Sequence, residues 1–148
     1  MRAYTFKEYI DRPPRDVWNV LVDLSVAPRW RPLVNAMETE DGQPVHAGSR
    51  VRLVVEYLGR RLTRVSTTTA FEPERRWTLH SGDLDSMDAD FDFELQPEGA
   101  GTRVIATCDL RAHRFLPWLF LPLLARGERQ RRVELLPNLK RYVEGTAR

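Results

Sequence analysis

The sequence predicts an α+β fold, in which an antiparallel sheet is followed by a helix near the C-terminus. Three observations carry this prediction. The segment from Tyr4 to Asp11 has the character of a strand, and residues 33–112 alternate between strand-like runs and turns. From about Pro122 to Glu144, apolar residues recur at helical spacing. Strands joined by turns and then a helix are typical of an α+β domain.

Two short helical segments are expected between the first strand and the rest of the sheet. Pro13 and Pro14 open the first segment, where a missing backbone N–H leaves no hydrogen bond unmade. Its apolar residues recur at spacings of three and four and form one stripe: Val17, Trp18, Leu21 and Val22. The second segment, from Ala27 to Pro32, is predicted to be only a helical turn, because each proline restricts the residue before it.

The middle of the chain predicts a series of strands, at residues 51–57, 61–71, 76–80, 87–95 and 102–110. Segment 87–95 gives the clearest signal, because acidic and apolar residues alternate strictly along it. Its acids therefore share one face of the strand: Asp88, Asp90, Asp92 and Glu94. Carboxylates at every second position are the ordinary solvated face of a strand, and no histidine pattern accompanies them. We therefore expect no metal site there.

The predicted C-terminal helix has a polar interruption in its apolar stripe. Glu128 and Arg132 lie four residues apart on the face that is otherwise apolar. Either this face passes over a cavity or an opening, or the two residues form a surface pair on a slightly rotated helix. Pro137 should kink or interrupt the helix near Val133.

Length, charge and cysteine content restrict the class of protein. A chain of 148 residues is expected to form one domain, 1–148. The net charge of +2 is too small to indicate nucleic acid as an obligatory partner. The single cysteine, Cys108, excludes an intramolecular disulfide and a cysteine-rich metal site. The N-terminal residues lack the regions of a signal peptide, so we expect a cytoplasmic location.

The order of these segments resembles the START/Bet v 1-like ligand-binding superfamily, and its polyketide cyclase/dehydrase-like members in particular. The resembling segments are the strand and helical stretch 4–32, the strand entry 47–51, the turn 71–77 and the helix ending 139–144. The resemblance implies a helix-grip fold: a seven-stranded antiparallel sheet wrapped around a long C-terminal helix, with two short helices between strands 1 and 2. It also implies an internal cavity for an apolar ligand. Pro137 and the proline-broken apolar segment 115–124 depart from the pattern.

Strand parity, combined with the implied fold, predicts which residues line the cavity. The candidates are Val55, Tyr57, Thr67, Thr69, Trp77, Leu79, Phe91, Phe93, Val104, Ala106, Leu124, Glu128 and Arg132. Each of them could equally belong to an ordinary filled core, and only the set as a whole, in a grip fold, favours a pocket. A bulge near Thr67 to Thr69 would reverse the faces of that strand. We expect no cofactor and no metal.

The sequence and the resemblance are compatible with three functions. The first is binding of a small hydrophobic ligand, such as a lipid, a quinone or a polyketide-like molecule. The second is a polyketide aromatase/cyclase-type enzyme acting on a poly-keto substrate, with Tyr57, His80, Glu128 and Arg132 as acid/base candidates, although His80 is expected to face outward. The third is a lipid or quinone carrier that docks on membranes through residues 115–126, where apolar residues precede arginine. That segment could instead form a homodimer contact or cover one end of the domain.

Overall fold

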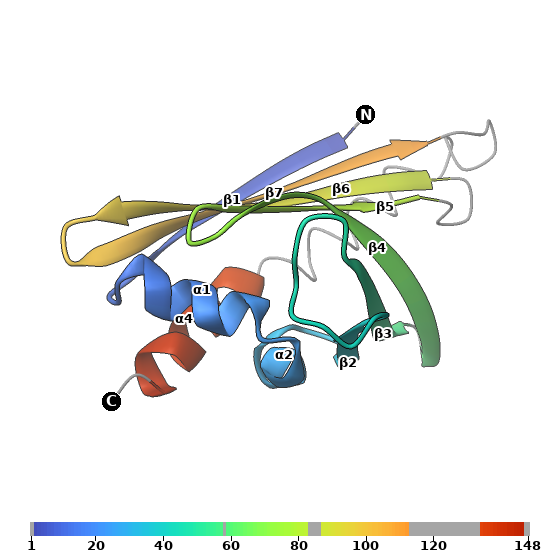
Figure 1. The fold of residues 1–148 in the computed structure, drawn as a ribbon, viewed down its shortest axis with the longest axis horizontal. Coiled ribbons are helices and arrows are strands. Elements are labelled where there is room, and N and C mark those ends of the chain that lie inside the picture. The colour runs from blue at the N-terminus through green and yellow to red at the C-terminus, as the bar shows by residue number, and fades with distance from the viewer. Residues whose placement is uncertain (1, 58, 83–86, 113–133, 147–148) are drawn as a thin grey trace.

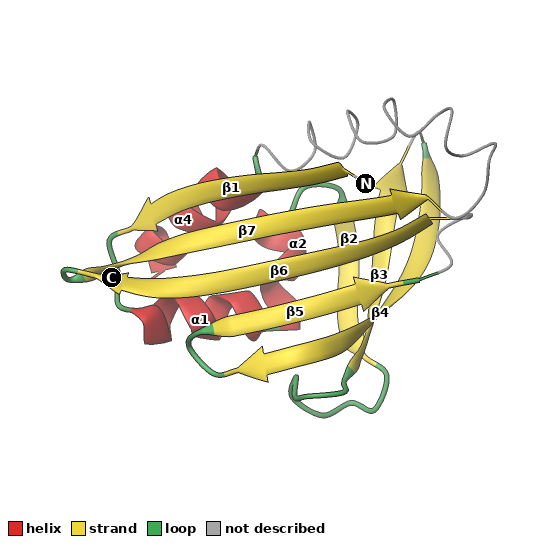
Figure 2. Ribbon diagram, turned by 90° about the horizontal axis from the view of Figure 1, so that it is seen from above, coloured by secondary structure: helices red, strands yellow, loops and turns green. Residues whose placement is uncertain are grey.

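The computed structural model describes residues 2–57, 59–82, 87–112 and 134–146, and its main feature is a sheet that arches over helices (Figure 1). The strands of the sheet are β1 (Arg2–Ile10), β2 (Val34–Thr39), β3 (Arg50–Tyr57), β4 (Arg60–Glu72), β5 (Arg76–Ser81), β6 (Met87–Glu98) and β7 (Gly101–Ala112). Their spatial order is β1-β7-β6-β5-β4-β3-β2 in one seven-stranded sheet, and every neighbouring pair is antiparallel (Figure 2).

Four helical elements are described: α1 (Pro14–Val22), the 3-10 turn η1 (Leu24–Val26), α2 (Ala27–Trp30) and α4 (Leu135–Thr146). They lie together on the concave side of the sheet (Figure 1). Helix α4 packs against β1, α1 and α2, and α1 also contacts β6 and β7. The predicted helix-grip architecture is thus confirmed, including the short helices between the first two strands. No helix in the described part of the chain is long and apolar enough to cross a membrane.

Helix α1 forms where the sequence predicts it. Pro13 is its N-cap and Pro14 its first residue, positions at which proline removes no intrahelical hydrogen bond. The predicted stripe faces the interior, with Val17, Trp18 and Leu21 buried. Asp23 then ends the helix, and its carboxylate accepts hydrogen bonds from the backbone N–H of Ser25 at 3.2 Å and from the Ser25 hydroxyl at 2.6 Å. This cap starts the 3-10 turn and directs the chain toward α2.

The sequence predicts that Pro137 kinks or interrupts the C-terminal helix near Val133, and the described helix α4 begins at Leu135. Pro137 lies in the first turn of the helix, where backbone N–H groups have no intrahelical partner to lose. The next residue, Asn138, already donates its N–H to the carbonyl oxygen of Glu134 at 3.0 Å. The earlier part of the predicted helix, residues 122–133, lies outside the described residues.

The C-terminal helix is fastened to the start of the chain by a small polar cluster. Glu144 Oε2 accepts hydrogen bonds from the Asp11 backbone N–H at 2.9 Å and from Lys140 Nζ at 2.7 Å. Lys140 Nζ also donates to the carbonyl oxygen of Tyr9 at 2.8 Å, and Arg12 Nη2 donates to the Glu144 carbonyl oxygen at 3.2 Å. The hydrogen bond from Asp11, followed by that from Lys140, lowers the pKa of Glu144 below its usual value.

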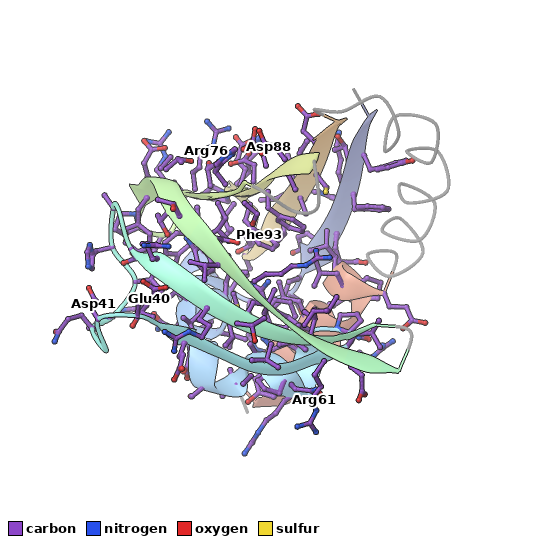
Figure 3. All side chains as sticks on the ribbon, turned by 90° about the vertical axis from the view of Figure 1, so that its right-hand side faces the viewer. Glu40, Asp41, Arg61, Arg76, Asp88 and Phe93 are labelled. Atoms are coloured by element: carbon purple, nitrogen blue, oxygen red, sulfur yellow. The ribbon has the colours of Figure 1, made fainter. Side chains whose placement is uncertain are left out.

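The alternation predicted for residues 87–95 is confirmed in β6 from Phe91 to Leu95. Phe91, Phe93 and Leu95 are buried, whereas the acids lie on the opposite face. There, side chains of the neighbouring strand β5 provide hydrogen-bond partners. Asp90 Oδ1 lies 2.6 Å from His80 Nδ1, and the Thr78 hydroxyl donates to Asp92 at 2.7 Å. In Figure 3, Phe93 lies inside the curl of the sheet, while Arg76 and Asp88 lie on its outer side.

Strand β4 departs from simple alternation at one point. Its register with β5 shifts between Thr68 and Ala70, so that Thr68 pairs with Leu79 on one side of the bulge and Phe71 pairs with Trp77 on the other. The predicted inward orientation of Thr67 and Thr69 is therefore wrong: both side chains are exposed, and Thr68 between them is buried. A bulge adds one residue to a strand, which moves the inward face by one position.

Candidate functional site

The floor of the candidate site is an aromatic layer on the concave face of the sheet. Trp77 in β5 pairs with Phe93 in β6, and Phe93 pairs with Ala106 in β7, so that the three side chains form one row. The next row contains Leu79 and Phe91. Directly paired residues of antiparallel strands point to the same face. Ring centroids lie 6.3 Å apart for Trp77 and Phe93, and 4.9 Å apart for Phe91 and Phe93.

One polar group belongs to this floor. The indole Nε1–H of Trp77, a side chain with no exposed surface, donates a hydrogen bond of 3.1 Å to the hydroxyl of buried Thr68. The β4 bulge makes this contact possible, because it brings Thr68, rather than Thr67 or Thr69, to the inner face. The hydrogen bond fixes the indole ring across β4 and β5 and satisfies its only donor.

A buried cation lies against the same floor. Helix α2 ends at Trp30, and Arg31 follows in extended conformation with its N–H bonded to the Ala27 carbonyl oxygen at 2.8 Å. This exit turns the Arg31 side chain into the aromatic layer, and only 9% of the residue is exposed. Its guanidinium carbon lies 4.7 Å from the ring centroid of Trp30, 5.4 Å from that of Phe93 and 6.0 Å from that of Trp77. These distances are within the range of cation–π attraction.

Trp30 brings a second donor to the same place. Its side chain is 2% exposed, and its Nε1–H is buried with no hydrogen-bond partner within the described part of the chain. Because the Arg31 guanidinium lies 4.7 Å from the Trp30 ring, the indole N–H and the guanidinium belong to one cluster. Both groups only donate hydrogen bonds. The cluster can therefore bind an oxygen acceptor or polarise a carbonyl group.

The structure brings most of the predicted sheet residues together. One buried core cluster contains Trp77, Leu79, Phe91, Phe93, Val104 and Ala106. Val55, in β3, is also buried but does not belong to that cluster. Thr67 and Thr69 are not part of this set, because the β4 bulge turns their side chains to the outer face. The side chain of Tyr57 and the helix residues Leu124, Glu128 and Arg132 lie outside the described residues, as does the proposed docking segment 115–126. The polar interruption of the helix therefore stays a prediction.

Sequence reasoning missed the two residues that give the site its polar character. Arg31 stands between Trp30 and Pro32 in a segment expected only to close a layer, and charged residues in such turns are usually solvated. The available sign of burial was the position of this arginine between a tryptophan and a proline. Thr68 was missed because parity was counted without the bulge.

The described polar residues His80 and Asp90 lie on the outer face of the sheet, away from this interior site. His80 faces outward, as expected, where it contacts Asp90. Among the described residues, no three His, Cys, Asp or Glu side chains gather into a group that could hold a metal ion. His80 is no longer an acid/base candidate for the cyclase reaction, because the sheet separates its side chain from the interior.

The loop between β2 and β3 holds an exposed ion pair. His46 Nε2 lies 3.1 Å from Asp41 Oδ2, and Asp41 Oδ1 accepts a hydrogen bond of 3.0 Å from the Gln43 N–H. The Ala47 carbonyl oxygen, 2.8 Å from His46 Nδ1, and the Asp41 carboxylate raise the pKa of His46 above its usual value. The Gln43 N–H and His46 lower the pKa of Asp41. Figure 3 shows Asp41 at the periphery, far from Phe93.

The profile of one family, described as polyketide cyclase / dehydrase and lipid transport, matches residues 1–144. The chain is a member of this polyketide cyclase/dehydrase family. The match spans every described strand and nearly all of α4. A search of curated protein sequences gave no match.

Solved structures of other proteins agree with this membership. The ZhuI aromatase/cyclase from Streptomyces sp. R1128 is similar with a TM-score of 0.82 at 18% identity, over 99% of this chain and 96% of that one. A protein from Thermus thermophilus, TTHA0849, gives 0.81 at 21% identity, over 99% and 100%. A START superfamily protein from Mycobacterium smegmatis gives 0.72 at 17% identity, over 97% of both chains. At such identities the likeness establishes the shared START/Bet v 1-like fold of the polyketide cyclase/dehydrase family.

Proposed function

We propose that the protein binds a small hydrophobic molecule in a cavity between the concave face of the sheet and the C-terminal helix. The observation that carries the proposal is the aromatic floor formed by Trp77, Phe91 and Phe93 on the side of the sheet that faces the helices. Family membership supports it, because the family description names lipid transport and polyketide cyclisation. Ligand sites are usually concave, mostly apolar and equipped with a few polar groups that fix orientation.

The proposed contacts follow from the inner face of the sheet. Val55, Leu79, Val104 and Ala106 would supply aliphatic surface around the aromatic rings, and Thr68 would replace Thr67 and Thr69 among the predicted lining residues. Tyr57, Leu124, Glu128 and Arg132 remain proposed members of the lining. Removal of apolar ligand surface from water contributes roughly 25 cal/mol per Å² before the costs of association. A lipid, quinone or polyketide-like molecule has enough apolar area to use such a surface.

Native mass spectrometry of the protein purified from its own host tests this function, with denaturing extraction of whatever is bound. We expect a species that carries one small apolar molecule, and its extracted mass would identify the ligand class. Titration of the delipidated protein with a neutral fluorescent probe, phenylnaphthylamine, provides the second arm. A protein that carries no extractable molecule and also fails to bind the neutral probe would contradict the proposal.

A polyketide cyclase/dehydrase-type activity is the second candidate. The family description and the printed name of the ZhuI aromatase/cyclase support it, and the buried Arg31 and Trp30 donors could polarise a carbonyl of a poly-keto chain. Aldol condensation followed by dehydration removes one water for each ring formed. Incubation with a poly-β-keto substrate, followed by mass spectrometry, should then show a product lighter by one water per ring. Unchanged substrate after incubation with ligand-free protein would refute this activity and leave ligand binding as the proposed function.

A further inference from the structure

The interior of this protein contains two adjacent hydrogen-bond donors among groups that are otherwise apolar. Arg31 is 9% exposed and Trp30 is 2% exposed, and the guanidinium carbon lies 4.7 Å from the Trp30 ring. The Trp30 Nε1–H has no hydrogen-bond partner within the described residues. A buried donor without a partner costs about 1–3 kcal/mol, which an incoming acceptor can recover. The unpartnered Trp30 N–H therefore indicates, independently of Arg31, that a hydrogen-bond acceptor fits beside it.

Arg31 determines the charge of the group that would fit. The Trp30, Trp77 and Phe93 rings around its guanidinium provide cation–π attraction to this positive charge. Arg31 makes further contacts within the protein, and a guanidinium with five N–H donors can hold these together with a ligand oxygen. In a low-dielectric interior, a cation favours an anion far more strongly than a neutral dipole. The planar fork of arginine also matches the two oxygens of a carboxylate.

We propose that Arg31 and the indole N–H of Trp30 form an anion-binding subsite for the head group of the internal ligand, whose apolar body lies against the concave face of the sheet beside the aromatic layer. The ligand class is then an apolar acid: an aromatic or aliphatic molecule that ends in a carboxylate or a comparable oxyanion. This inference rests on the interior ligand site proposed above and adds the chemistry of its head group. Charge at Arg31 would orient the ligand, while apolar side chains of the concave face would supply most of the buried area.

Two fluorescent probes with one framework test the subsite directly. Anilinonaphthalene sulfonate carries an oxyanion, and phenylnaphthylamine has the same two aromatic units without it. We expect the wild-type protein to bind one molecule of either probe, in competition with each other. Arg31→Gln should weaken binding of the sulfonate about tenfold or more, as loss of a charge-assisted hydrogen bond does, and change binding of the neutral probe by less than about twofold.

Matched variants separate the subsite from general effects of charge and folding. Arg29→Gln removes an exposed arginine from α2, two residues before Arg31, and should leave both affinities unchanged. Trp30→Phe keeps an aromatic ring but removes the N–H, and should weaken only the sulfonate, by about threefold to tenfold. If Arg31→Gln does not fold, Arg31→Lys keeps the charge but loses the fork, and with Trp30→Phe it carries the test.

The outcomes distinguish this inference from the function on which it rests. If wild-type protein binds neither probe, the interior ligand site itself is refuted. If both probes bind but folded Arg31 and Trp30 variants bind the sulfonate as tightly as wild type, the ligand site stands and the anion subsite is refuted. Equal losses for both probes would also overturn the subsite, since they indicate damage to the apolar floor. Probes that bind without competing would place the sulfonate elsewhere and have the same consequence.

Discussion

Thr68 shows how one backbone irregularity decides what a single residue does. Three threonines follow one another in β4, and alternation assigns the outer two to the interior. The bulge between Thr68 and Ala70 gives the opposite result and places the middle hydroxyl against the Trp77 indole. Neither propensity nor hydrophobicity separates three identical side chains, so only the pairing of β4 with β5 selects Thr68.

Replacement of Thr68 by valine should destabilise the protein by about 1–3 kcal/mol. The variant keeps the branched shape but removes the acceptor, so that the Trp77 N–H is left buried without a hydrogen bond. Thr67→Val, at the exposed neighbouring position, should change the free energy of unfolding by no more than about 0.5 kcal/mol. Urea denaturation of the two variants measures the difference, and equal free energies would contradict the assigned hydrogen bond.

His46 should titrate above the usual pH range of a histidine, because its charged form is held by the Ala47 carbonyl oxygen and by Asp41. A folded-state pKa raised above the unfolded value means that this stabilisation is complete below the unfolded pKa and is lost as pH rises through the folded pKa. NMR titration of the imidazole measures the shift. Asp41→Asn should lower the pKa of His46, whereas Glu40→Gln, which removes the partner of Arg50, should not. Identical titration curves for these two variants would refute the pair.

At the scale of elements, the sequence was most informative where local chemistry and tertiary packing agree. Helix α1 has prolines at its start, one apolar stripe and an acidic cap at its end, and β6 alternates along its core-facing length. Each signal comes from residues close together in the chain, so periodicity detects it. The α4 helix was harder to predict, because the effect of Pro137 depends on whether it falls in the first turn or in the interior of a helix.

Two glycine substitutions should have opposite effects on these elements. A Cβ at Gly101, where β7 begins, would collide with the Tyr9 hydroxyl and lie 2.5 Å from the Ile10 carbonyl oxygen, so Gly101→Ala should destabilise by about 1–3 kcal/mol. At Gly145, in the last turn of α4, no heavy atom lies within 4 Å of an added Cβ. Gly145→Ala should therefore stabilise, by about 0.5 kcal/mol, because alanine favours the helix. Thermal unfolding of both variants checks the signs, and stabilisation by Gly101→Ala would contradict the close β1–β7 contact.

At the scale of the whole molecule, the Glu144 cluster joins the C-terminal helix to the end of the first strand. The hydrogen bonds from Asp11 and Lys140 lower the pKa of Glu144, and the first of them spans nearly the full length of the chain in sequence. A depressed folded-state pKa contributes stability above the unfolded pKa, and that stability is lost as pH falls through the folded pKa. The helix that closes the concave face is therefore held less firmly in acid.

Glu144→Gln should lower the free energy of unfolding by about 0.5–1 kcal/mol above about pH 5, where the wild-type carboxylate is charged. The difference between the two proteins should shrink as the pH falls below that range, because the wild-type residue then becomes neutral as well. Chemical denaturation across a pH series measures this difference. Glu134→Gln, at the exposed residue before α4, serves as the control. A difference for Glu144→Gln that does not depend on pH would refute the role of its charge.

The sequence by itself determined the class of this protein: an α+β, helix-grip domain of the polyketide cyclase/dehydrase family, with a concave face of Trp77, Phe91 and Phe93. The helices, the strands and the face of β6 follow from short-range periodicity, whereas the grip fold and the family follow from the resemblance of segments and their order to known proteins. Only the tertiary structure decided that Arg31 lies inside, against three aromatic rings, and that Thr68 holds Trp77. Burial of a charge and the position of a bulge depend on which strands pair and which helices pack against them. These contacts join residues that are far apart in the chain.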